Sequence, residues 1–187
     1  MKPYEPPLLV GLVGISGSGK DKFYSTFLAK LGYTKLALAD AVRVLSVYYV
    51  LKSYPGIENN EKELLRIFPL LYAEIFKMEK SAYSRTLQQY IGTDFGRKND
   101  ENIWIKAIEP LVNERLEKNI KVAITDIRFK NEANFVKSKG GILIKIENSG
   151  RYDKHQNEAL HSSEKEINDI EYDFTHLEFE QKFSNHI

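Results

Sequence analysis

A short stretch near the N-terminus has the residue types and spacing of a loop that holds phosphate groups. Gly14 to Asp21 read GISGSGKD, which is one residue short of the pattern G-x-x-x-x-G-K-[ST]. In that pattern, glycines let backbone N–H groups turn toward phosphate oxygens, and the lysine reaches the outer phosphates of a nucleotide. The candidate phosphate-binding residues are Gly14, Ser16, Gly17, Ser18, Gly19 and Lys20. The alternative is a tight strand-to-helix turn with an exposed lysine.

Two acidic residues could hold a magnesium ion beside this loop. Asp21 stands where the pattern has a hydroxyl group, and magnesium accepts carboxylate oxygens either directly or through a water molecule. Asp126 ends the apolar run KVAIT, and ligands of open α/β folds lie at the carboxyl ends of strands. The sequence therefore predicts Asp21 and Asp126 as metal contacts, with a helix cap as the alternative for Asp126.

Arginines offer the positive charge that phosphate groups require. Arg97 lies in GTDFGRKND, which we expect to be a loop between two helices, and its guanidinium group could hold a phosphate through two parallel bonds. Arg128 follows Asp126 at the same predicted sheet edge. Weaker candidates are Arg43, Arg85 and Arg151. Tyr83, Tyr90 and Trp104 could stack on a base, but their helical spacing favours a place in the core.

The elements that must position these residues alternate between strands and helices. Strands are expected at 8–13, 35–38, 121–125 and 142–146, with a last one at 171–176, and helices at 20–31, 131–139 and 177–183. This alternation predicts an α/β fold with a parallel sheet and right-handed crossovers. Residues 41–118 are predicted to be mostly helical, with Asp100 as an N-cap and Pro110 as a kink or break. This stretch should project from the sheet as a subdomain, and 148–163 should form a loop or lid.

Composition narrows the class of protein. The 187 residues contain no cysteine, which excludes a disulfide framework, a thiolate metal site and a cysteine nucleophile. The net charge of +1 argues against a partner such as long nucleic acid. No apolar run is long enough to cross a bilayer, so we expect no membrane partner and a cytoplasmic location. The four histidines form no metal-binding pattern, and no Ser-His-Asp order supports hydrolase chemistry.

Taken in order, five motifs resemble those of the deoxynucleoside monophosphate kinases, a P-loop kinase family often encoded by phages. They are GSGKD, LALADAVR, LQQYIGTDFGR with a later Trp, ITDIRFKNEA and HSSE. The resemblance implies a single P-loop NTPase-type domain over 1–187, with three layers and a parallel sheet of about five strands. It also implies a helical acceptor-binding insert over about 43–118 and a lid over about 148–163. The phosphate loop of this family typically reads G-K-D, so Asp21 is a feature of the family.

The resemblance implies transfer of a phosphoryl group from ATP to a deoxynucleoside monophosphate, with Mg²⁺ as cofactor and small nucleotides as partners. The phosphate loop would bind ATP, and Asp40, Arg43 and Asp126 would bind the acceptor. Arg97 and Arg128 would hold the phosphates being joined, with Lys20 as the third catalytic cation. Glu132 would orient Arg128 or the acceptor. If the chain is phage-encoded, the host cytoplasm is the expected location.

Two positions depart from the family pattern. Lys22 replaces the usual threonine after G-K-D, and IENSGR lacks the usual Arg-Pro, which weakens Arg151 as an ATP contact. The HSSE segment, with His161, Ser163 and Glu164, matches the family without a defined role.

Other functions stay open at the level of sequence. They include a kinase of another small phosphorylated acceptor, such as phosphomevalonate or, more distantly, dephospho-coenzyme A, and a nucleotide-binding module without turnover. A polynucleotide 5′-end kinase is disfavoured by the charge balance. The accepted bases, the preference between ribose and deoxyribose, and the oligomeric state, a homodimer included, are not determined by the sequence.

Overall fold

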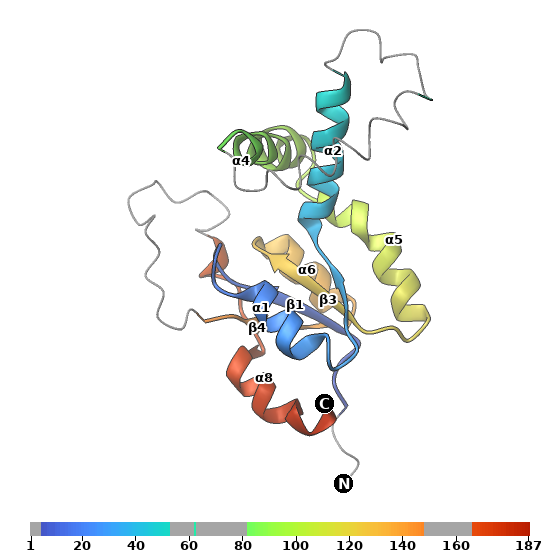
Figure 1. Ribbon diagram of the computed structural model, residues 1–187, viewed down its shortest axis with the longest axis vertical. Coiled ribbons are helices and arrows are strands. Elements are labelled where there is room, and N and C mark those ends of the chain that lie inside the picture. Colours follow the sequence, from blue (N-terminus) through green and yellow to red (C-terminus); the bar gives the residue numbers. More distant parts are fainter. Residues whose placement is uncertain (1–4, 53–61, 63–81, 148–165) are drawn as a thin grey trace. The chain divides into compact units, whose positions relative to one another are not determined.

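The chain forms two compact units (Figure 1). A computed structural model describes residues 5–52, 62, 82–147 and 166–187. The first unit combines Met1–Leu38 with Ile108–Ile187, and the second unit comprises Ala39–Ala107. The second unit is thus inserted into the chain of the first, between its second and third strands.

The first unit is built on a five-stranded sheet in which all neighbouring strands are parallel. The strand order is β2-β3-β1-β4-β5, which confirms the predicted α/β fold class with a parallel sheet. The strands are β1 (Leu9–Val13), β2 (Thr34–Leu36), β3 (Val122–Ile127), β4 (Ile142–Lys145) and β5 (Phe174–Thr175).

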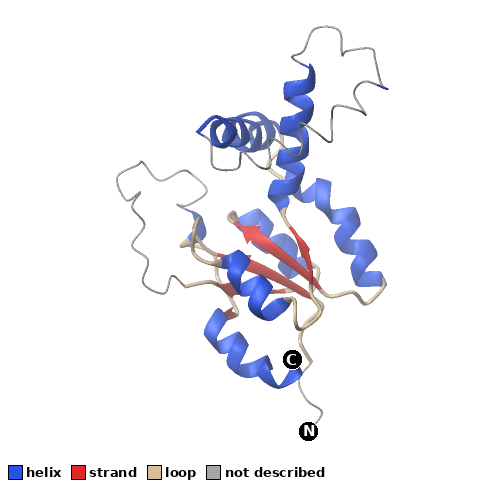
Figure 2. Cartoon of the chain, in the orientation of Figure 1, coloured by secondary structure: helices blue, strands red, loops and turns tan. Residues whose placement is uncertain are grey.

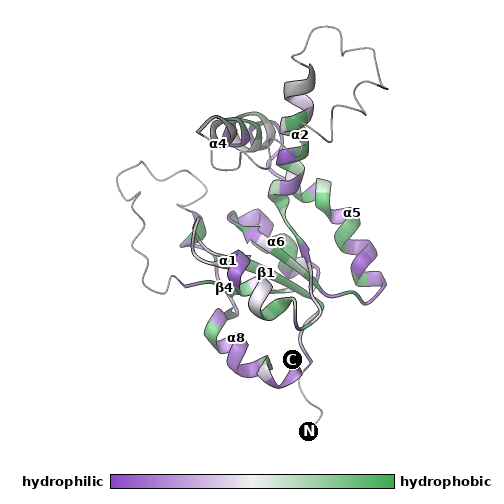
Figure 3. Ribbon diagram, in the orientation of Figure 1, coloured by the Kyte–Doolittle hydropathy of each residue, from purple (hydrophilic) through white to green (hydrophobic). Residues whose placement is uncertain are grey.

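Helices cover both faces of this sheet (Figure 2). On one face, Val10 and Leu12 of β1 join an apolar cluster with aromatic residues of the helix that follows β1 and of the last α-helix. These helices are α1 (Lys20–Phe23), continued by the π-helix η1 (Tyr24–Leu28), and α8 (His176–Phe183), which the 3₁₀-helix η3 (Ser184–His186) follows. Because both faces of the sheet are covered, the central strand β1 reads as a continuous apolar run (Figure 3 colours the chain by hydropathy).

The opposite face is covered by α6 (Lys130–Ser138). Gly11 of β1 allows this close packing, because a Cβ atom there would lie 2.8 Å from Leu143 Cδ2 and 3.1 Å from Val136 Cγ2. The glycine inside the strand is therefore a packing requirement and not a break in the strand.

The order of the strands creates a switch point beside β1. From β1 the chain passes to β2 and then β3 on one side, whereas α6 carries it from β3 to β4 on the other side of β1. The loops after β1 and β3 therefore leave neighbouring strands in opposite directions. In open parallel sheets, ligands bind in the crevice outside the strand ends at such a point.

The second unit contains only helices within its described residues. The helix α2 (Leu38–Lys52) enters it, α4 (Ala82–Gln89) runs directly into the π-helix η2 (Tyr90–Arg97), and α5 (Ile103–Glu117) leaves it. Lys98 and Asn99 are helical as well. The expectation of a loop at GTDFGRKND is therefore wrong, because its two glycines lie inside a helix.

Smaller differences from the sequence-based expectations have local causes. The second strand ends at Leu36 because α2 already begins at Leu38, and the last strand is only Phe174–Thr175. Pro110 does not break α5, which runs through it. The described part of the chain has no helix that is both long and apolar enough to cross a membrane.

Candidate functional site

The loop between β1 and α1 has the conformation that its glycines allow. Gly17 and Gly19 have φ angles of 76° and 99°, in the left-handed region that side chains other than glycine rarely adopt. At Gly14 the constraint is space, because a Cβ atom would lie 2.6 Å from Ser18 Oγ and 3.1 Å from the Ile146 carbonyl oxygen. Each of the three glycines is thus required by the observed loop.

Lys20 is buried inside this loop. Its Nζ atom donates hydrogen bonds to the carbonyl oxygens of Gly14, at 2.5 Å, and Ile15, at 2.6 Å, and to Ser18 Oγ, at 3.3 Å. The side chain is therefore not the exposed lysine of an ordinary turn. Ser18 is buried beside it, whereas Ser16 and Gly17 are exposed at the tip of the loop. A buried ammonium group enclosed by a glycine loop is suited to bind an anion.

Asp21, the first residue after this lysine, points to the surface. Its carboxylate forms an ion pair with Lys35 of β2, with 2.7 Å between Oδ1 and Nζ, and 82% of its side chain is exposed. An exposed pair of this kind contributes about 0–1 kcal/mol to stability. The pair therefore costs little to break, and the predicted metal contact of Asp21 stays a prediction.

Asp126 lies at an irregular point of β3. Gly11 pairs with Ile124, but Val13 pairs with Ile127, so β3 carries one extra residue between these positions. Such bulges redirect side chains and are common beside active sites. The Oδ1 atom of Asp126 accepts the backbone N–H of Leu38 at 2.9 Å, at the start of α2. Asp126 thus caps this helix, which was the structural alternative to a metal contact.

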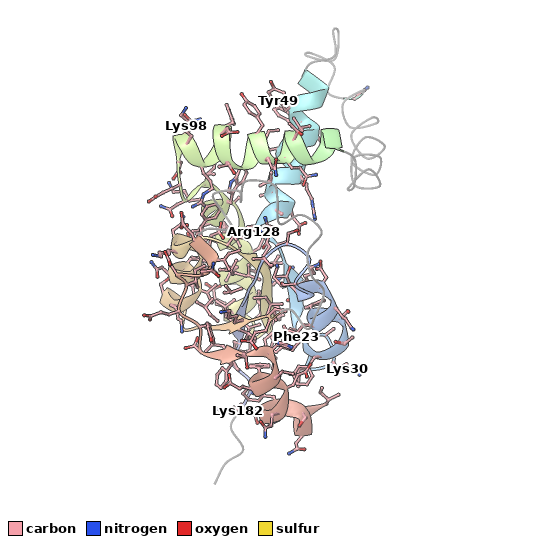
Figure 4. The ribbon with its side chains drawn as sticks, turned by 90° about the vertical axis from the view of Figure 1, so that its left-hand side faces the viewer. Phe23, Lys30, Tyr49, Lys98, Arg128 and Lys182 are labelled. Atoms are coloured by element: carbon pink, nitrogen blue, oxygen red, sulfur yellow. The ribbon has the colours of Figure 1, made fainter. Side chains whose placement is uncertain are left out.

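Arg128 follows β3 directly and is held through its backbone. The buried carboxylate of Glu132 accepts the backbone N–H groups of Arg128, at 2.8 Å, and Phe129, at 3.1 Å. Glu132 is the third residue of α6 and satisfies N–H groups that the first turn of a helix leaves unpaired. Figure 4 shows Arg128 where β3 passes into α6. These bonds hold the main chain at Arg128, and the predicted role of Glu132 in orienting Arg128 or the acceptor stays a prediction.

The register of the sheet brings the phosphate loop and Arg128 together. Val13 is the Cα partner of Ile127, and each strand continues directly into its loop, to Gly14 and to Arg128. The two loops therefore begin side by side at the switch point. Lys20, Asp126 and Arg128 share this edge of the sheet, as the sequence predicts. No group of three or more His, Cys, Asp or Glu residues that could hold a metal ion occurs among the described residues.

The remaining described candidates belong to the second unit. Asp40 lies in the first turn of α2 and pairs with Arg43, at 2.9 Å between Oδ1 and Nη1. Arg97 is the last residue of η2 and is half-buried.

Asp100, the expected N-cap, is not directly before α5, which begins at Ile103. It pairs with Lys106 at 2.6 Å and accepts the Asn102 N–H, and these bonds, the lysine first, lower the pKa of its carboxyl group.

Some candidates lie beyond the part of the chain that the structure describes. Arg151, His161, Ser163 and Glu164 lie outside the described residues, as does the predicted lid at 148–163. The side chains of Tyr83 and Arg85 are also outside the described part.

The two remaining aromatic candidates have different environments. Trp104 is buried, as its spacing predicts, and Tyr90 is exposed, contrary to a core position. The hydrogen bond from the indole N–H of Trp104 to the Gly92 carbonyl oxygen could not be predicted from the sequence.

Comparison with known proteins relates this geometry to a family. No family model matches the chain. A protein of Acanthamoeba polyphaga mimivirus, named "Putative deoxynucleotide monophosphate kinase", is 30% identical over 177 residues, which cover 87% of this chain and 83% of the viral protein. The chain belongs to the deoxynucleoside monophosphate kinase family. Membership of this family agrees with the five-stranded parallel sheet and the helices that cover it.

Proposed function

We propose that the protein transfers the γ-phosphoryl group of ATP to a deoxynucleoside 5′-monophosphate, giving ADP and a deoxynucleoside diphosphate. The observation that carries the proposal is the pairing of Val13 with Ile127. Because these two residues pair, two loops begin side by side at the carboxyl edge of the parallel sheet. One is the glycine loop around the buried Lys20, and the other carries Arg128. The name of the viral relative supports the nucleotide substrate.

Lys20 supplies the donor side of the reaction. In the structure its ammonium group is bound by carbonyl oxygens of its own loop. A phosphate oxygen carries more negative charge than a carbonyl oxygen and forms the stronger, charge-assisted bond. The β- and γ-phosphates of ATP can therefore draw Lys20 away from Gly14 and Ile15, while the glycine loop turns its N–H groups toward the phosphates.

The acceptor side requires positive charge more than it requires a base. The attacking oxygen of a nucleoside monophosphate is already an anion, so catalysis consists of alignment and charge neutralisation. Arg128 is held at the sheet edge through its backbone bond to Glu132. Arg97 comes from the second unit, and together the two guanidinium groups would hold the phosphates being joined. Asp40 and Arg43, paired in α2, would contact the acceptor nucleotide.

Further charge neutralisation at the transferred phosphate would come from a magnesium ion bound together with ATP. The donor set available for it consists of carboxylate oxygens, which suit magnesium. Asp126 and Asp21 are the residues that would hold it. Because magnesium keeps several water ligands and the oxygens of the nucleotide, one or two carboxylates suffice. The helix-capping bond of Asp126 at Leu38 then fixes the orientation of its side chain.

The proposed reaction is tested by measuring ADP formation against a panel of acceptors. The panel contains dAMP, dCMP, dGMP, dTMP, the matching ribonucleotides, phosphomevalonate and dephospho-coenzyme A. We expect at least one deoxynucleotide to raise ADP formation above ATP alone and to appear as its diphosphate. Turnover with phosphomevalonate or dephospho-coenzyme A alone would reassign the substrate. ATP binding without turnover on any acceptor would identify a nucleotide-binding module.

The two arginines provide the residue-level test. We expect Arg97→Ala and Arg128→Ala each to lower turnover about 100-fold or more with little change in ATP affinity. Lysine at either position should rescue only part of the activity, because the two-pronged geometry is lost. Lys98→Ala and Lys130→Ala are matched controls, since both lysines are exposed neighbours. A lower melting temperature with intact turnover per folded molecule would assign the arginines a structural role.

A further inference from the structure

The helix that carries Arg97 has an unusual hydrogen-bonding register. Tyr90–Arg97 is π-helical, and the N–H of Lys98 bonds to the carbonyl of Thr93, five residues earlier. By Asp100 the bonding has returned to four residues, with its N–H on the Gly96 carbonyl at 3.0 Å. Figure 4 shows Lys98 at one end of the long helix that α4 and η2 form. π-Helical turns are rare and frequently occur at functional sites.

The register depends on a glycine that leaves room for a tryptophan ring. A Cβ atom on Gly96 would lie 2.3 Å from Trp104 Cζ2 and 2.7 Å from the Ile91 carbonyl oxygen. Both distances are too short for any side chain. Glycine in a helix interior costs about 1 kcal/mol relative to alanine, and at this position the packing of Trp104 requires it.

The same tryptophan holds the helix through a hydrogen bond. Its Nε1–H donates to the Gly92 carbonyl oxygen at 2.8 Å, and the ring is 5% exposed. Gly92 itself has ordinary space, because a Cβ atom there would lie 3.5 Å from Val42 Cγ1. Trp104 therefore contacts the π-helix at two points, with its ring on Gly96 and its N–H on Gly92.

We propose that Trp104 is a positioning residue for Arg97, and that its two contacts maintain the π-helical register from which Arg97 reaches the acceptor phosphate. The proposal rests on the proposed function, in which Arg97 binds the phosphates. Arg97 directly follows Gly96, so the register at Gly96 sets the direction in which Arg97 leaves the helix. A change of one residue in register turns that direction by about 100°. Trp104 acts through the helix and does not touch the substrate.

Two variants disturb these contacts. Gly96→Ala displaces the ring from the helix, and Trp104→Phe keeps an aromatic side chain but removes both the N–H donor and the ring edge that lies on Gly96. Misplacement of a catalytic group by about 1 Å costs up to about 100-fold in rate, so we expect each variant to lower kcat with a deoxynucleotide about tenfold or more. The KM for ATP should be unchanged. Trp104→Ala should be worse than Trp104→Phe.

Gly92→Ala is the matched control. It also places alanine in the same helix, but it has space and leaves the carbonyl oxygen in place for Trp104. We expect its kcat to stay within about twofold of wild type, because alanine is favoured over glycine in helices. If folded Gly96→Ala and Trp104→Phe keep wild-type kcat and differ from wild type only in melting temperature, Trp104 is purely structural and the proposal is overturned.

A second measurement does not depend on turnover or on the folding of the Gly96 and Trp104 variants. Trp104 is the single tryptophan of the chain, so intrinsic tryptophan fluorescence reports on it alone. We expect titration with the best deoxynucleotide acceptor to change this fluorescence in the wild type and not in Arg97→Ala. A signal that is equal in both proteins, or absent although the acceptor is bound, contradicts coupling between Trp104 and Arg97.

Failure of the proposed function gives a different pattern. If no deoxynucleotide is phosphorylated but one changes Trp104 fluorescence in an Arg97-dependent manner, the positioning role stands for a binding site and the kinase reaction fails. If the reaction occurs and Arg97→Ala abolishes it while Gly96→Ala and Trp104→Phe remain fully active, the kinase reaction stands and the positioning role fails.

Discussion

At the scale of single residues, Lys20 has the strongest physical case for a catalytic role. It is a buried cation that donates hydrogen bonds to neutral oxygens of a glycine loop. We expect Lys20→Ala to lower acceptor-dependent ADP formation by at least about 100-fold, because a charge contact to the transferring group is worth on the order of 3 kcal/mol. Steady-state kinetics measure this loss.

Lys22→Ala is the control for that experiment. It removes a lysine from the same helix, but this side chain is exposed. Near wild-type turnover in Lys20→Ala would show that the loop does not bind the transferred phosphate.

Asp21 presents a choice between a metal contact and a surface ion pair. We expect Asp21→Ala to raise the magnesium concentration needed for half-maximal activity, and Asp21→Ser to restore it in part, because an oxygen ligand returns. Lys35→Ala removes the observed partner and should not raise the magnesium requirement. Magnesium titrations of the initial rate distinguish these variants. If all three keep the wild-type magnesium dependence, Asp21 serves only the ion pair at the start of the helix.

At the scale of elements, most of the sheet could be predicted from the sequence because its strands are buried on both faces. Val122–Ile127 and Ile142–Lys145 read as apolar runs, and their ends are predicted to within one or two residues. The phosphate loop could also be predicted, because its backbone conformation requires glycine at positions only a few residues apart. In both cases the residues that give the signal belong to the element itself.

The elements that could not be predicted depend on contacts between distant residues. GTDFGRKND resembles a loop because it contains two glycines, yet the segment is helical, and Trp104, eight residues beyond Gly96, packs on it. The extra residue in β3 beside Asp126 is set by pairing with Gly11 and Val13. The partners of Asp21 and Asp126, Lys35 and Leu38, are likewise supplied by the fold.

The start of α6 gives a testable link between an element and the site. Glu132 is buried and accepts two backbone N–H groups, one of them from Arg128. We expect Glu132→Ala to reduce the free energy of unfolding by about 1–3 kcal/mol, because buried donors lose their acceptor, and to lower turnover as well. Glu132→Gln should retain most of both, since glutamine can serve in the same cap. Urea unfolding and steady-state kinetics measure the two effects.

Glu178 offers a matched comparison for Glu132. It has the corresponding position in α8 and accepts the Thr175 N–H at 2.7 Å, but its side chain is exposed. Glu178→Ala should reduce stability slightly and leave turnover per folded molecule unchanged. If Glu132→Ala also affects stability alone, the backbone bond to Arg128 has no part in catalysis.

At the scale of the whole molecule, the chain passes between its two units within helices. The boundaries fall between Leu38 and Ala39 in α2 and between Ala107 and Ile108 in α5. Pro110 lies just beyond the second boundary. A proline in a helix interior removes the N–H that would bond four residues back, here to Lys106. The helix α5 therefore lacks one backbone hydrogen bond next to the boundary. A change in the relative position of the two units would require α5 to bend there.

This arrangement leads to a prediction about closure. A kinase that transfers phosphoryl groups must exclude water from the site or it hydrolyses ATP, and movement of an inserted unit commonly achieves this. We expect a bisubstrate analogue, in which adenosine and a deoxynucleoside are joined through phosphates, to slow hydrogen exchange in the Ala39–Ala107 unit as well as in the phosphate loop. ATP alone should protect the loop and leave the second unit largely unchanged. Lys20→Ala should lose both effects if the analogue binds through the loop. Exchange in Ala39–Ala107 that is identical with and without the bound analogue would show that the inserted unit does not close, and water would then have to be excluded by another part of the chain.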